Sequence, residues 1–164
     1  MADAAEIRAL IESAFRGDSA RRGWNHEADL LDDERTSLAE IERLLAAKEV
    51  SLCVARDQND AIIGCVAVTV VDETLGYLGM LTVSPDLQSA GLGTKLLRAA
   101  EDKALSLGLS TMEMTVISQR DSLIAWYERS GYARTGERRP FPVPRRSLGR
   151  KPISTPQEFR EGIK

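Results

Sequence analysis

The spacing of apolar residues changes within residues 78–94, Leu-Gly-Met-Leu-Thr-Val-Ser-Pro-Asp-Leu-Gln-Ser-Ala-Gly-Leu-Gly-Thr. The first part continues an apolar run that is typical of a β-strand, and Pro85 ends that strand. From Leu92 onward apolar residues recur on one helical face until Gly108 closes the helix. Residues 88–93, Gln-Ser-Ala-Gly-Leu-Gly, therefore form a glycine-containing turn between a strand and a long helix.

This turn has two interpretations. Gly91 and Gly93 let the backbone approach a ligand closely, and the unpaired N–H groups of a first helical turn favour phosphate. The Lys-Ser/Thr pair of a P-loop is missing, and so is the third glycine of a dinucleotide-binding turn. On the glycines alone, a tight turn with close helix packing is as good an explanation as a phosphate cradle.

The rest of the chain predicts a mixed α/β domain. The predicted elements are helices 4–16, 38–48, 92–107 and 121–130 and strands 50–55, 61–71, 75–83, 111–117 and 132–139. Ser37 and Glu40 have the spacing of a capping box, and Asp121 can cap the last helix. Short connections favour antiparallel pairing of the first three strands, and the long helix favours a parallel partner for the third.

Composition sets the limits on function. The chain has 164 residues, of which 43% are hydrophobic and 29% charged, as in a folded domain with a core of its own. Residues 61–71 are the longest apolar stretch and are too short to span a membrane, and the N-terminus lacks a signal-peptide pattern. We therefore expect a cytoplasmic protein. With two cysteines and one histidine, we expect no metal site and two free cysteines in the core.

Charge is unevenly distributed. The net charge is −3, yet residues 138–151 hold six basic residues and no acidic one. Such a segment can bind nucleic acid, but no aromatic platform accompanies it, so a solvated segment is the favoured interpretation. We expect one domain over residues 1–140 and a basic, proline-containing tail over residues 141–164.

A second motif identifies a family. Trp-Tyr-Glu-Arg-Ser-Gly-Tyr occupies residues 126–132, downstream of Gln88-x-x-Gly91-x-Gly93. The two motifs, in this order and on these elements, resemble the GNAT superfamily of acyl-CoA-dependent N-acetyltransferases over roughly residues 50–139. The resemblance implies a mixed, mostly antiparallel sheet, with a central parallel pair splayed around acetyl-CoA and helices on both faces.

The resemblance also implies roles for individual residues. Backbone N–H groups would hold the pyrophosphate of coenzyme A at Gln88, Ser89, Ala90, Gly91, Leu92, Gly93 and Thr94. The main chain of Leu81, Thr82 and Val83 would pair with the pantetheine arm and polarise the thioester carbonyl. Tyr127 would protonate the leaving thiolate as a general acid, and its alternative is a core aromatic on a helix face.

The acceptor side is less well defined. Many relatives carry a carboxylate base on the strand before the turn, but residues 75–83 contain no Asp or Glu. Glu27, His26 and Glu73 are the remaining candidates, and each also fits a solvated surface position. Trp24 and Glu27 lie between the two N-terminal helices, which border the acceptor pocket in this family. Both are candidate substrate contacts, and helix packing through Trp24 is an equal alternative.

The two ends depart from the family pattern. Relatives usually begin with a strand, whereas this chain starts with a helix, and the segment from Arg145 onward shows no convincing final strand. Edge strands lost in this way leave exposed backbone that a second copy can cover, so a homodimer is one expectation.

Two functions follow from these observations. The first is an enzyme that moves acetyl from acetyl-CoA to a primary amine of a small molecule or amino-acid-like acceptor, by direct attack in a ternary complex. The alternative is a non-catalytic acyl-CoA-binding regulatory or interaction module, because the base is missing from the third strand.

Overall fold

The structure is a computed structural model that describes residues 2–15, 37–88, 90–116, 120–138 and 149–152. Its elements are, in chain order, α1 (Ala2–Phe15), α3 (Leu38–Ala46), β1 (Val50–Arg56), β2 (Ile62–Val70), β3 (Leu75–Val83), η1 (Pro85–Leu87), α4 (Leu92–Ser106), β4 (Thr111–Met114), α5 (Asp121–Arg129), β5 (Ala133–Arg134) and β6 (Gly149–Pro152). Hydrogen bonds join the strands in the order β1-β2-β3-β4-β6-β5.

Contacts group the chain into two compact units. The first comprises Met1–Ala67 and Met80–Ala100, and the second comprises Val68–Gly79 and Glu101–Lys164. Because the boundaries fall within β2, β3 and α4, each of these elements has residues in both units.

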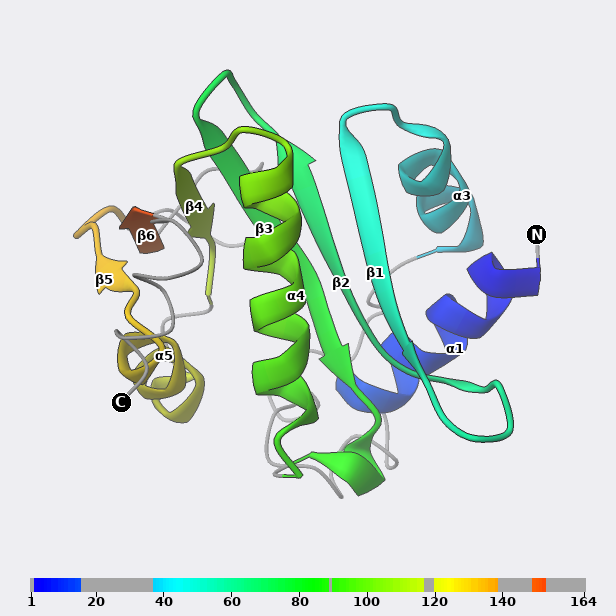
Figure 1. Ribbon diagram of the computed structural model, residues 1–164. Coiled ribbons are helices and arrows are strands. Elements are labelled where there is room, and N and C mark those ends of the chain that lie inside the picture. The colour runs from blue at the N-terminus through cyan, green and yellow to red at the C-terminus, as the bar shows by residue number, and fades with distance from the viewer. Residues whose placement is uncertain (1, 16–36, 89, 117–119, 139–148, 153–164) are drawn as a thin grey trace. The chain divides into compact units, whose positions relative to one another are not determined.

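In the first unit, α1 packs against α3, and α3 packs against β1 (Figure 1). The buried cluster comprises Ala4, Ile7, Leu10, Ile11, Ala14, Ile41, Ile62 and Cys65. Side chains alternate along a strand, so Gly64 faces the opposite side of β2 from Cys65. A Cβ on Gly64 would lie 2.7 Å from Leu96 Cδ1 and 3.5 Å from Leu92 Cδ2, both on α4. Helices therefore lie on both faces of β2, as the sequence predicts.

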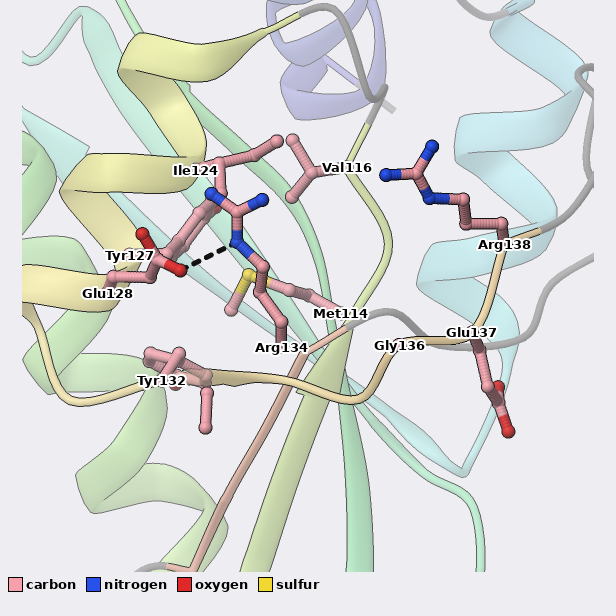
Figure 2. Close-up of a pocket in the computed structure, with 11 residues that line it drawn as sticks. Met114, Val116, Ile124, Tyr127, Glu128, Tyr132, Arg134, Gly136, Glu137 and Arg138 are labelled. Carbon is pink, nitrogen blue, oxygen red and sulfur yellow. Dashed lines mark hydrogen bonds and ion pairs between the residues drawn. The ribbon is translucent and has the colours of Figure 1, made fainter.

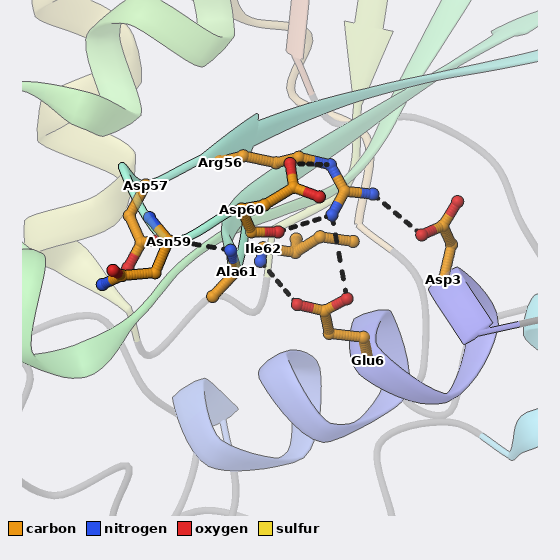
Figure 3. Close-up of polar contacts among 8 residues, drawn as sticks. All are labelled: Asp3, Glu6, Arg56, Asp57, Asn59, Asp60, Ala61 and Ile62. Atoms are coloured by element: carbon orange, nitrogen blue, oxygen red, sulfur yellow. Dashed lines mark hydrogen bonds and ion pairs between the residues drawn. The ribbon is translucent and has the colours of Figure 1, made fainter.

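A polar cluster fixes α1 to the β1–β2 hairpin (Figure 3). Arg56 donates to Asp3 Oδ1 at 2.8 Å and to the Asp60 carbonyl at 2.7 Å. Glu6 Oε1 accepts from the Ile62 N–H at 2.6 Å, which satisfies the first amide of β2. The Arg56 contacts involve exposed groups and the Glu6 contact is half-buried, so together they set the orientation of α1 while the buried apolar face supplies most of its stability.

The ends of two helices test the predicted caps. The capping box of α3 is confirmed: Ser37 Oγ accepts from the Glu40 N–H at 3.2 Å, and Glu40 Oε2 accepts from the Ser37 N–H at 2.7 Å. The predicted cap of α5 is wrong, because Arg120 is the N-cap residue and Asp121 is already inside the helix. Asp121 lies in the first turn of α5, where its negative charge still interacts favourably with the positive end of the helix dipole.

The second unit contains the parallel pair. β3 and β4 run parallel in the register Leu75↔Thr111 to Tyr77↔Glu113, and β6 is antiparallel to both β4 and β5. A Cβ on Gly76 would lie 2.7 Å from Met112 Sδ, so only glycine fits there without rearrangement. The fold class predicted from the sequence is thus confirmed in its mixed, mostly antiparallel sheet with one parallel pair.

The strands after α4 differ from the prediction in two ways. β6 lies in the segment for which no final strand was predicted, and it pairs with β4 along its full length. Its four residues, Gly-Arg-Lys-Pro, show no apolar alternation, so only the non-local pairing reveals the strand. β5 is also shorter than predicted, and Gly136 follows it with φ +80°.

Candidate functional site

The end of β3 bends at one residue. Met80 has φ +56°, in the left-handed region that non-glycine residues rarely occupy. Its carbonyl accepts from the Thr82 hydroxyl at 2.9 Å and from the Cys65 thiol at 3.5 Å. Beyond the bend the Ser84 N–H donates to the Ile63 carbonyl at 2.9 Å, so β3 ends beside β2. Thr82 and Cys65 therefore stabilise a local conformation that is strained on its own.

Cys65 is fully buried beneath this bend, and burial raises the pKa of its thiol from 9.0 to about 12, with the Thr82 hydroxyl partly offsetting the effect. The buried neutral thiol contributes stability that is fully present below about pH 9. This contribution is lost as the pH rises from 9 towards 12, because the thiol ionises in the unfolded state and stays neutral in the folded state. We expect Cys65→Ala to reduce the loss of unfolding free energy between pH 8 and 10.5 by about 2 kcal/mol. Urea unfolding of both proteins at the two pH values measures this difference, and equal losses would contradict it.

The turn after β3 is tied back to the strand. The Gln88 side chain donates from Nε2 to the Val83 carbonyl at 3.3 Å, and the Ala90 N–H donates to the Leu87 carbonyl at 3.3 Å. Gly91 follows with φ +81°, and among the described residues other than its two chain neighbours no atom lies within 4 Å of the position its Cβ would take. The turn therefore presents open space that any side chain at Gly91 would enter.

The first turn of α4 presents its backbone N–H groups to this space. Among the described residues, its first backbone hydrogen bond runs from the Lys95 N–H to the Gly91 carbonyl at 3.2 Å. The N–H groups of Leu92, Gly93 and Thr94 precede that bond, and within the described part of the chain they have no helical acceptor. Amide donors, the helix dipole and an open glycine position together suit a phosphate group. The residues present therefore fit the pyrophosphate of coenzyme A.

Tyr127 of α5 lies in a buried aromatic cluster of the second unit. Its ring packs edge-on against the rings of Trp126 and Tyr132, with ring centroids 4.9 Å and 5.7 Å apart. Tyr132 in turn donates its hydroxyl proton to Glu101 Oε1 at 3.0 Å. Burial raises the pKa of Tyr127, the charge of Arg120 lowers it and Tyr77 raises it further. The net effect keeps the Tyr127 hydroxyl protonated at all ordinary pH values, as a proton donor must be.

Tyr127 also lines a cavity of about 150 Å³ in this unit (Figure 2). Met114, Val116 and Ile124 provide apolar walls. Charged side chains complete the lining: Glu128, Arg134, Glu137 and Arg138. Among them, Arg134 Nε donates to Glu128 Oε1 at 2.7 Å. The cavity thus combines apolar surface, a phenol and charged groups, which is typical of a site for a small polar ligand.

The structure brings together part of the predicted site. Leu81, Thr82, Val83, Gln88, Ala90 and residues 91–94 adjoin one another at the end of β3 and the start of α4. Tyr127 belongs to the second unit. Ser89, Trp24, His26 and Glu27 lie outside the described residues, and Glu73 is exposed in the turn before β3.

Sequence reasoning missed three features. The left-handed conformation of Met80 cannot be recognised in the apolar sequence of a strand, and only the position of Met80 shortly before the turn hints at it. Arg120 carries no motif that marks it in the sequence, whereas its charge acts on Tyr127. Arg138 belongs to the basic segment 138–151, for which a solvated role was favoured, whereas it lines the cavity.

Within the part of the chain that the structure describes, no group of three or more His, Cys, Asp or Glu side chains is gathered as metal ligands would be. None of the described helices combines the length and apolar character that crossing a bilayer requires.

The mixed sheet with its parallel pair and the glycine turn before α4 agree with the family resemblance, and sequence comparison gives the family. Residues 6–132 match the Acetyltransferase (GNAT) family. Since this is well over half of the chain, the protein belongs to that family.

Curated relatives carry different acceptor names. An amino-acid acetyltransferase of Pseudomonas putida is 30% identical over 117 residues, 71% of this chain but only 26% of the relative. The chain thus spans about a quarter of that protein's length. An IAA acetyltransferase of Azospirillum brasilense is 28% identical over 127 residues, which cover 76% of this chain and 82% of the relative.

Solved structures share the fold. A GNAT-family acetyltransferase of Staphylococcus aureus Mu50 has a TM-score of 0.70 at 16% identity, covering 93% of this chain and 94% of the other. A GNAT-family acetyltransferase of Elizabethkingia anophelis, solved with acetyl-CoA bound, has a TM-score of 0.56 at 20% identity, with 70% and 78% covered. At these identities the likeness shows the fold alone.

Proposed function

We propose that this protein transfers the acetyl group of acetyl-CoA to a primary amine of a small-molecule or amino-acid-like acceptor, by direct attack in a ternary complex. The observation that carries the proposal is the open, left-handed Gly91 at the start of α4. Without a side chain at this position the backbone can approach a phosphate, and a side chain would occupy the space that the phosphate needs. Membership of the acetyltransferase family supports acetyl-CoA as the bound molecule.

The chain's own residues divide the work. The N–H groups of Leu92, Gly93 and Thr94 would bind the pyrophosphate, and Gln88 would hold the turn in place through its bond to the Val83 carbonyl. The main chain of residues 81–83 would pair with the pantetheine arm. When bound, acetyl-CoA supplies a thioester whose acyl carbon accepts the amine. Tyr127 would hold the proton that the departing thiolate takes up.

The acceptor follows from the relatives' names and the cavity together. One relative is named for amino acids. The cavity beside Tyr127 is small, about 150 Å³, and has apolar walls and charged groups. An amino-acid-like amine therefore suits it better than a large protein surface. No general base is assigned, because β3 contains no Asp or Glu.

The same missing base favours a second candidate, an acyl-CoA-binding regulatory or interaction module without useful catalysis. This module would share the turn at Gly91 and would bind acetyl-CoA equally well. It differs from the enzyme only in lacking amine-dependent release of the thiol.

Calorimetric titration with acetyl-CoA, repeated with free CoA, tests the shared part of both proposals. We expect micromolar binding, about −8 kcal/mol. The second step is thiol release in the presence of a panel of primary amines, including α-amino acids. Binding with amine-dependent release supports the enzyme, and binding without release across the panel supports the module. No binding would overturn both.

A further inference from the structure

Within the described part of the chain, the cavity beside Tyr127 has one cation that is not already engaged, Arg138. Arg134 is held by Glu128 at 2.7 Å, so the charges of these two residues largely cancel. Arg138 lines the same cavity, and within the described part of the chain no ion pair or hydrogen bond involves its guanidinium. We propose that Arg138 binds a carboxylate of the acceptor, so that the preferred substrates are amines that also carry a carboxylate. This inference rests on the proposed acetyltransferase function.

The orientation of the side chains supports this assignment. Figure 2 shows the guanidinium groups of Arg134 and Arg138 directed towards the side of the cavity where Val116 lies. The Glu137 side chain points away from that side. An anion in the cavity therefore meets Arg138 without competition from the neighbouring carboxylate in the chain.

The walls strengthen such a contact. Met114 and Tyr127 are buried and Val116 and Ile124 are half-buried, whereas Arg138 is exposed, so a ligand here is shielded from water on its apolar side only. A charge-assisted hydrogen bond is stronger where water is excluded, and a guanidinium can bind a carboxylate through two parallel N–H groups.

Charge also distinguishes the acceptor from the acyl donor. The thioester end of acetyl-CoA is neutral, and its phosphates are assigned to the turn at Gly91. The unengaged charge of Arg138 therefore complements the acceptor, and a carboxylate is the anion that an amino-acid-like amine carries.

The experiment compares each of several α-amino acids with its own α-carboxamide, for example leucine with leucine amide. The two have the same amine-bearing carbon, but only the acid can bind a guanidinium as an anion. We expect the wild-type protein to prefer the acids. Arg138→Gln should lower kcat/KM for the acids by roughly 10- to 100-fold and leave the amides nearly unchanged. Arg138→Lys should fall between, because it keeps the charge but loses the two-point geometry.

Arg129→Gln is the matched control. Arg129 is an exposed arginine of α5 that does not line the cavity, and the substitution makes the same change in net charge. The control should keep the acid preference. Amides acetylated as well as acids, or equal effects of Arg138→Gln on both, would overturn the assignment to Arg138. If no amine of either kind releases thiol, the proposed function itself fails, and that result is distinct.

Discussion

Replacement of Tyr127 by Phe should lower kcat for acetyl transfer by roughly 100-fold or more, while the Kd for acetyl-CoA changes little. The substitution removes one hydroxyl and keeps the ring that packs edge-on against Trp126 and Tyr132. The leaving thiolate would then take its proton from water. Burial keeps the pKa of Tyr127 above its ordinary value, so the wild-type donor stays protonated and should give no alkaline limb below about pH 10.

Tyr132→Phe is the matched control for this prediction. It removes a hydroxyl from the same aromatic cluster, but that hydroxyl donates to the buried Glu101 at 3.0 Å. Loss of the bond leaves a buried carboxylate without this donor, so the free energy of unfolding should fall by about 1–3 kcal/mol. Urea unfolding and steady-state kinetics on both variants separate the two roles. Unchanged turnover in Tyr127→Phe would remove Tyr127 from the mechanism.

The sequence predicted most of the fold because its signals are local. The strand over residues 75–83 and the helix from Leu92 have the bounds that the apolar spacing and Gly108 indicated, to within a residue or two. The capping box at Ser37 was equally legible, since it depends on two side chains three residues apart. β6 was not, because its residues carry no strand pattern and pair with a strand about forty positions earlier.

The candidate site divides along the same line. The turn around Gly91 could be predicted because glycine is the residue that a left-handed, closely approached position requires. The bend at Met80 could not, because it depends on Thr82 and Cys65 meeting one carbonyl across two strands. The cavity could not be predicted either, because Arg138 lines it together with residues of α5 and β4, and that arrangement depends on tertiary structure.

Gly91→Ala should weaken acetyl-CoA binding by roughly 10-fold or more. At φ +81° an alanine is strained by about 1–2 kcal/mol, so the turn would tend to leave this conformation before a ligand arrives. Among the described residues nothing lies near the position of the new methyl group, so its effect on folding comes from the backbone alone. The methyl would also stand in the space that we assign to the pyrophosphate. The backbone strain and this steric overlap would both weaken binding.

Gly108→Ala separates strain from ligand contact. Gly108 has φ +80°, and a Cβ there would likewise meet no described atom within 4 Å. It ends α4 by donating its N–H to the Leu105 carbonyl at 3.0 Å, while the Leu109 N–H reaches the Ala104 carbonyl at 3.0 Å. Both variants should therefore lose a similar free energy of unfolding, about 1–2 kcal/mol. Only Gly91→Ala should raise the calorimetric Kd for acetyl-CoA, because only Gly91 stands beside the N–H groups of Leu92 and Gly93 that we assign to the pyrophosphate. An equal rise in Kd for both variants would mean that global strain, and not the turn at Gly91, controls binding.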